Sequence, residues 1–158
     1  SDDGNTGVTV SLISGDETRT NLGNRTLYSI VATHDMGNLH YVIQHDNGFT
    51  QDSTAAGGEN RWYGINQYLT YDVSDTLAGG LRFEWFRDQE GSRVGTAANY
   101  FAATAGVNWD PISWLRLRPE IRYDWTELSS GANGPFQDDS GNPQSDQFTI
   151  GGSLIIQL

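Results

Sequence analysis

The sequence contains no cysteine and no lysine, so all nine basic residues are arginine. Without cysteine, neither a disulfide nor a thiolate metal site can form. The 20 acidic residues outnumber the basic ones and give a net charge of −11, which argues against nucleic acid as a partner. No run approaches the ~20 apolar residues of a membrane helix, and no apolar repeat persists at helical spacing. The sequence therefore favours a protein built from strands.

Proline is scarce, at 4 residues, whereas glycine is abundant, at 19, which fits many strands joined by tight turns. A chain of 158 residues corresponds to one domain by size, so we expect a single domain over 1–158. The chain begins at Ser-Asp-Asp-Gly without an apolar signal segment, and we expect either a mature form or a fragment of a longer protein.

The segment 114–127 carries the clearest pattern. Side chains alternate between the two faces of a strand. One face of this segment would hold Leu115, Leu117, Pro119, Ile121, Tyr123 and Trp125, and the other Arg116, Arg118, Glu120, Arg122 and Asp124. A charge on the lipid side of a membrane strand costs about 2–4 kcal/mol near the midplane, so a wall between lipid and a polar lumen requires this division. We interpret the segment as a transmembrane strand.

Seven other segments alternate in a similar way. The eight predicted strands cover 7–14, 25–36, 39–47, 61–73, 76–88, 99–110, 114–127 and 147–158. Tight turns at 36–39, 73–76 and 110–113 alternate with long polar connections at 15–24, 48–60, 89–98 and 128–146. Short turns on one side and long loops on the other are typical of outer-membrane barrels. The predicted fold is all-β, an antiparallel up-and-down transmembrane β-barrel of about eight strands.

Aromatic residues fall near both rims of the predicted lipid face, where interfacial girdles are expected. They are Tyr63, Phe83, Trp85, Phe101, Tyr123 and Trp125 on the long-loop side, and Tyr71 and Trp109 on the short-turn side. Three residues depart from the alternation: Gln67 falls on the lipid face, and Phe86 and Ile155 fall on the lumen face. The segment 39–47 alternates weakly in either register.

Several stretches resemble OmpL-like outer-membrane β-barrel porins. The resemblance lies in Trp62-Tyr63-Gly64-Ile65, in Leu81-Arg82-Phe83-Glu84-Trp85-Phe86-Arg87-Asp88, in Leu117-Arg118-Pro119-Glu120-Ile121-Arg122-Tyr123-Asp124 and in the closing apolar strand. It covers roughly 25–158. It implies that these strands form the C-terminal part of a longer barrel, although the chain ends in Leu158, where such barrels commonly end in an aromatic residue.

Seven charged residues are predicted to line the lumen: Arg82, Glu84, Arg116, Arg118, Glu120, Arg122 and Asp124. We expect Glu120 to pair with Arg118 and Arg122. In a wide barrel this set would line a pore whose arginine surplus favours anions. In a closed eight-stranded barrel it would fill the interior as a salt-bridge network. Both alternatives remain open from the sequence.

The expected function is a porin-like barrel in a bacterial outer membrane that passes small hydrophilic solutes or ions. Its expected partners are outer-membrane lipid and lipopolysaccharide, with no cofactor or metal. The alternatives are a non-conducting structural or surface-binding barrel and a soluble lipocalin-type barrel. Because His34, His40 and His45 lie near no nucleophile motif and no metal-ligand spacing, we expect no enzyme activity.

Overall fold

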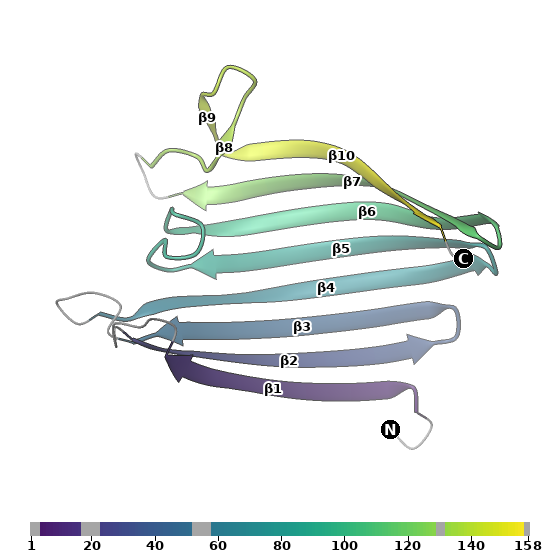
Figure 1. Cartoon of the computed structure of the whole chain (residues 1–158), viewed down its shortest axis with the longest axis horizontal. Helices are drawn as coiled ribbons and strands as arrows, with labels where there is room; N and C mark the ends of the chain where they lie inside the picture. The colour runs from purple at the N-terminus through teal and green to yellow at the C-terminus, as the bar shows by residue number, and fades with distance from the viewer. Residues whose placement is uncertain (1–3, 17–22, 52–57, 129–131, 157–158) are drawn as a thin grey trace.

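The computed structural model describes residues 4–16, 23–51, 58–128 and 132–156, and its regular elements in these ranges are all strands. No helix within these ranges is long and apolar enough to cross a membrane. Eight strands form one antiparallel sheet (Figure 1). In spatial order they are β1 (Thr6–Asp16), β2 (Asn24–Met36), β3 (Leu39–Thr50), β4 (Asn60–Ser74), β5 (Leu77–Asp88), β6 (Ala98–Ile112), β7 (Leu115–Leu128) and β10 (Asp146–Ile156).

The strands turn back on themselves through short connections at one end of the sheet and long ones at the other, as predicted (Figure 1). Met36 pairs with Leu39 across a two-residue turn, in which Gly37 has a φ of 65°. Glycine adopts this left-handed conformation without steric cost. The turn between β6 and β7 lies at 113–114, slightly later than predicted, because an irregularity in the pairing between Trp109 and Ile112 lengthens β6. We call the two ends the turn end and the loop end.

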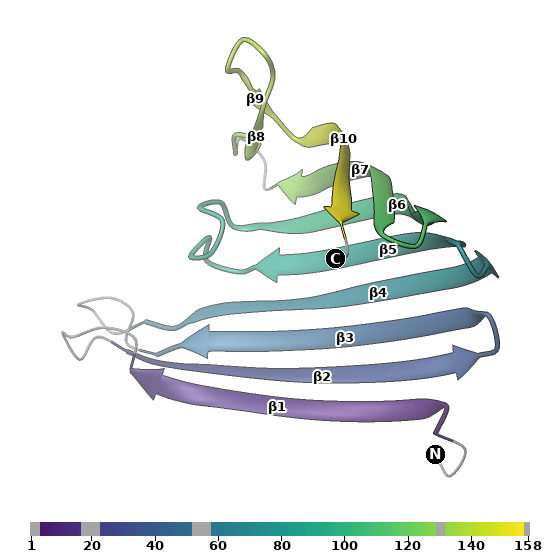
Figure 2. The ribbon, with the colours of Figure 1, turned by 45° about the vertical axis from the view of Figure 1, so that its right-hand side comes forward.

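The sheet twists from one edge to the other. In Figure 2, turned by 45°, β7 and β10 are foreshortened while β1 to β4 still run across the view. Such progressive rotation follows from the right-handed twist of individual strands. A separate hairpin of β8 (Phe136–Gln137) and β9 (Pro143–Gln144) projects beyond β10 at the loop end. This hairpin lies within the long connection predicted at 128–146.

The sheet is open in the described residues. β1 pairs only with β2, and β10 pairs only with β7. Both edge strands are exposed along all of their residues. The predicted closure of eight strands into a barrel is therefore absent from this structure. An alternating pattern determines which side chains share a face, but it is the same in an open and in a closed sheet. The last predicted residues, 157–158, lie outside the described part of the chain.

The two faces of the sheet differ in both chemistry and burial. The polar face carries Arg82, Glu84, Arg122 and Asp124, and the apolar face carries their sequence neighbours. All buried side chains of the described strands lie on the polar face: Thr50, Trp62, Asp88, Ala98, Ala102, Thr104 and Asp124. Large hydrophobic side chains on the apolar face are exposed, among them Leu81, Ile121 and Ile150. Relative to a water-soluble protein, the sheet is inverted.

Candidate functional site: the polar face

A network of charged side chains crosses the middle of the polar face. Arg122 on β7 donates to Glu84 on β5, and its Nε lies 2.9 Å from Oδ1 of Asp124. Arg82 also pairs with Glu84, with 3.2 Å between Nε and Oε2. On the intervening strand β6, Thr104 is small enough to let these long side chains meet, and its hydroxyl accepts from both arginines at 3.4 Å. The network therefore joins three strands through their side chains.

The network continues to the neighbouring edge strand. Nε2 of Gln147 on β10 donates to Oδ2 of Asp124 at 3.2 Å. Asp124 is buried, so both of its carboxylate oxygens have partners within the sheet. Buried charges are stable only when they are paired and hydrogen-bonded. Asp124 is thus fully paired, whereas the buried Nε of Arg82 makes only the ion pair with Glu84 and no hydrogen bond within the described residues.

At the loop end, the connection between β5 and β6 folds over the polar face. Asp88 is completely buried and accepts three backbone N–H bonds, from Ser92 at 3.0 Å and from Arg93 and Val94 at 2.8 Å each. The guanidinium carbon of Arg93 consequently lies 4.7 Å from the ring centre of Trp62. Arg25 approaches the same ring, at 5.4 Å. A single indole therefore holds two cations close together.

At the turn end, charged groups pair across neighbouring strands. Arg116 makes a bidentate contact with Asp110, with two N–O distances of 2.7 Å. His40 lies between two carboxylates, with Nδ1 2.6 Å from Oδ1 of Asp35 and Nε2 3.0 Å from Oδ2 of Asp72. These contacts tie β2, β3 and β4 together where the chain turns. Within the described residues, no group of three or more His, Asp or Glu side chains is placed to hold a metal ion.

The seven residues predicted to line a lumen all project from the polar face, but they do not form one ladder. Arg82, Glu84, Arg122 and Asp124 belong to the central network, and Arg116 pairs separately with Asp110. Arg118 and Glu120 are exposed and make no ion pair within the described residues. The expectation that Glu120 pairs with Arg118 and Arg122 was wrong, because Glu84 lies across the small residue Thr104 and reaches Arg122 instead.

The predicted aromatic residues lie on the apolar face and gather at its loop end. The Trp125 ring stacks on Phe101 at 5.3 Å and on Tyr123 at 5.6 Å between ring centres. Phe83 packs against the same ring at 6.2 Å, while Tyr63 and Trp85 form an edge-to-face pair at 5.6 Å. Tyr71 and Trp109 stand exposed toward the turn end. Their contact with a membrane interface remains a prediction.

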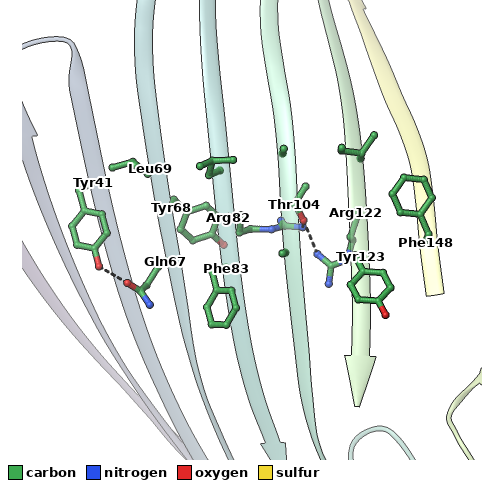
Figure 3. A pocket seen from close by; sticks show the side chains of 14 residues that line it. Tyr41, Gln67, Tyr68, Leu69, Arg82, Phe83, Thr104, Arg122, Tyr123 and Phe148 are labelled. Carbon is green, nitrogen blue, oxygen red and sulfur yellow. Dashed lines mark hydrogen bonds between the residues drawn. The ribbon is translucent and has the colours of Figure 1, made fainter. Parts of the chain in front are cut away.

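The residues that departed from the alternation each have a partner or an exposed position. On the apolar face, the Tyr41 hydroxyl donates to Oε1 of Gln67 at 2.7 Å (Figure 3). On the polar face, Phe86 packs against Tyr100, with 6.2 Å between ring centres. Ile155 lies on the edge strand β10 and is exposed. The weakly patterned segment 39–47 takes its register from pairing on both sides, which places Tyr41 and Ile43 on the apolar face.

Sequence reasoning missed the loop-end cluster and the His40 contacts. The available signal for the first was an aspartate at the end of a strand, Asp88, followed by Gln-Glu-Gly-Ser, since an aspartate there readily accepts backbone N–H bonds. The packing of Arg93 on Trp62 carries no such local signal, because 31 positions of sequence separate the two residues. The His40 contacts depend on the register of three strands and are equally nonlocal.

The fold and the polar face together define an all-β antiparallel sheet protein. Its charged face carries the buried side chains, and its apolar face is exposed. The chain belongs to the family described as "Putative beta-barrel porin-2, OmpL-like", whose model matches residues 1–158, the whole chain. The resemblance noted over roughly 25–158 therefore extends through the first strand. Neither a curated protein nor a solved structure matches the chain significantly.

Proposed function

We propose that this protein is a porin-like β-barrel of a bacterial outer membrane. The single observation that carries the proposal is the inverted distribution of burial. Buried side chains lie on the polar face, and large hydrophobic side chains on the apolar face are exposed. Leaving apolar area in water costs about 25 cal/mol per Å² relative to an apolar environment. Lipid on the apolar face removes this cost, and membership of the porin family agrees with that arrangement.

The proposal requires the two edges of the sheet to be paired. Lipid offers no hydrogen bonds to backbone groups, so an open edge is excluded from the hydrocarbon region. In the proposed barrel, β1 and β10 pair either with each other or with further strands between them. The strand number sets the interior: eight strands leave room for side chains, whereas a larger number leaves an aqueous channel.

Within this barrel, the polar face lines the lumen and small hydrophilic solutes or ions diffuse through it. The partly buried guanidinium groups of Arg82 and Arg122 and the exposed group of Arg118 would give the lumen its polar wall. Outer-membrane lipid would contact the apolar face, and lipopolysaccharide would contact the loop end. The proposal includes no catalytic step and no cofactor.

A second candidate is a non-conducting structural barrel, and the central network favours it. Glu84 on β5 pairs across the intervening strand β6 with Arg122 on β7, which also pairs with Asp124, so their groups occupy the middle of the polar face. In a narrow barrel such contacts would leave no continuous path for a solute. The two candidates share the same membrane orientation and differ only in the width of the lumen.

Recording in planar lipid bilayers separates the candidates. The full chain, refolded in detergent, should insert and give discrete conductance steps if it is a porin. Membrane-inserted protein that gives a silent bilayer would favour the plugged barrel and overturn the porin. Heat-modifiable migration on SDS gels checks barrel formation independently. A monodisperse monomer without detergent would overturn both candidates, because its apolar face would then have to be covered by protein.

A further inference from the structure

A cavity of about 310 Å³ lies at the loop end of the polar face. Its walls come from four separate parts of the chain: the end of β1, the start of β2, Trp62 on β4, and Arg93 from the connection between β5 and β6. Small-molecule sites start at about 300 Å³ and combine apolar walls with a few well-placed polar groups. This cavity has that size and that mixture of walls.

The cationic wall is held in a fixed position. Arg93 is anchored through its backbone, because its N–H donates to buried Asp88 at 2.8 Å, and those of Ser92 and Val94 donate to the same carboxylate. The hydroxyl of Tyr100 donates to the carbonyl of Thr96 at 2.7 Å and fixes the other end of the connection. A guanidinium that is already positioned loses less conformational entropy when it binds a ligand.

The indole ring of Trp62 packs against this guanidinium. The indole is only 6% exposed, and Gly48 lies directly opposite it on β3. A Cβ at position 48 would collide with the ring, so glycine makes room for the indole. Trp62 and Arg93 both line the cavity, but the ring is largely covered, so the guanidinium of Arg93 offers a ligand its polar contact. Guanidinium groups bind carboxylates through paired, charge-assisted hydrogen bonds.

The opposite wall is apolar. Ile13 and Leu27 face each other in the β1–β2 register and both line the cavity. Ile13 is 69% exposed, a large hydrophobic side chain on a face otherwise rich in polar groups. The porin proposal gives this pair no role. An apolar patch beside a fixed cation fits a ligand that has an apolar group and a single anionic group.

We propose that this cavity binds small organic monocarboxylates. The carboxylate pairs with Arg93, and the apolar tail lies on Ile13 and Leu27. Arg25 and Asp16 also line the cavity and carry opposite charges, so together with Arg93 the lining has a single net positive charge, which matches a ligand with one anionic group. The site rests on the proposed function only in requiring that the polar face is reached from water. It adds a solute class to that function: short aliphatic or aromatic monocarboxylates.

Three four-carbon probes test the site in the full chain refolded in detergent micelles: butyrate, the dicarboxylate succinate and neutral 1-butanol. The readout is the indole N–H resonance of Trp62, identified by its loss in Trp62→Phe. Butyrate should shift this resonance saturably. Succinate and 1-butanol should bind at least about tenfold more weakly, since succinate has a second charge in place of an apolar tail and 1-butanol has no charge to pair with Arg93. The four other tryptophans report any general effect of the probe on the micelle.

Variants assign the contacts. Arg93→Gln should weaken butyrate binding at least about tenfold, because a charge-assisted pair is lost. Ile13→Ser, on the other wall, should weaken binding about fivefold through lost apolar contact. Arg118→Gln removes the same charge from the polar face outside the cavity and should leave binding unchanged. Ile13→Ser also tests the site independently of the Arg93 connection, should that connection fail to form in Arg93→Gln.

Equal affinity for butyrate and 1-butanol, or unchanged binding in both Arg93→Gln and Ile13→Ser, would overturn the site. Conductance in planar bilayers without butyrate binding would overturn the site and leave the porin standing. Butyrate binding by a protein that leaves bilayers silent would support the site and overturn the porin.

Discussion

Strand β7 places the two environments of the molecule on adjacent residues. Arg122, on the polar face, is partly buried and pairs with carboxylates from β5 and from its own strand. Ile121, on the apolar face, is 49% exposed and has the small residue Ala105 opposite it on β6. The charged residue is thus the better covered of the two. Charged side chains are usually the exposed ones in a soluble protein.

This difference indicates what each face needs from its surroundings. In its middle, the polar face supplies partners for its own charges, since Glu84, Thr104 and Asp124 contact Arg122 from three strands. The apolar face supplies few contacts for its own large side chains and depends on an external apolar phase. Moving a charge from one face to the other is therefore the most direct test of this difference.

The largest effect is expected from Ile121→Arg. Near the middle of the membrane this change should destabilise the inserted protein by about 2–4 kcal/mol, because lipid cannot solvate the guanidinium. The matched change on the same strand, Arg118→Leu, should cost less than about 0.5 kcal/mol, since Arg118 is exposed and makes no ion pair within the described residues. Urea unfolding in lipid vesicles measures both. Equal stabilities would mean that the faces do not meet different environments.

The next effect concerns the loop end. Asp88→Ala leaves the N–H groups of Ser92, Arg93 and Val94 without their acceptor and should cost about 2–3 kcal/mol. Asp88→Asn keeps one carbonyl acceptor and should cost less. Unfolding in vesicles gives the free energies, and protease cleavage near Gly91 reports release of the connection. An Ala variant with native stability and native protease resistance would show that Asp88 does not hold this segment.

Much of the strand pattern was predictable because it is local. The alternation on β7 fixed the two faces, and the observed ends of all eight sheet strands lie within a few residues of the predicted ones. The family resemblance was also confirmed by the family match. Closure was not predictable, since alternation is the same in open and closed sheets. Closure of the sheet into a barrel is part of the proposed function.

The partners on the polar face were less predictable, because they depend on contacts across strands. Arg122 was assigned to the right face, but its acceptor Glu84 lies two strands away, 38 positions earlier in the sequence. The nearby Glu120, favoured from sequence proximity, is exposed instead. Likewise, the alternation offers no partner for Gln67 on the apolar face, whereas the β3–β4 register brings the Tyr41 hydroxyl close enough to donate to it. Face assignment is a local property, whereas partner choice requires the register.

Two glutamates on the polar face sharpen this distinction. Glu84→Gln should destabilise the protein by about 1–2 kcal/mol, because it weakens two contacts to partly buried arginines. Glu120→Gln should change stability by less than about 0.5 kcal/mol. The measurement is urea unfolding in vesicles at one ionic strength for both variants. If Glu120→Gln proved the more damaging, the pairing first inferred from the sequence would be the correct one.

The smallest effect lies outside the sheet, in the β8–β9 hairpin, and depends on pH. The Asp138 carboxylate accepts hydrogen bonds from the side chain and backbone of Asn142 and from the backbone of Ser140, and these bonds hold its pKa below the usual range. A lowered pKa in the folded hairpin means that the stabilising contribution is complete above the ordinary aspartate pKa. It is lost as the pH falls through the lowered value. The protection factors of the Ser140 and Asn142 amides, which correct for the intrinsic slowing of exchange in acid, should therefore fall as the pH falls, while those within β7 stay high. Asp138→Asn should show lower protection factors already at neutral pH and little further change in acid. A pH-independent hairpin in the native chain would mean that this carboxylate does not organise the turn.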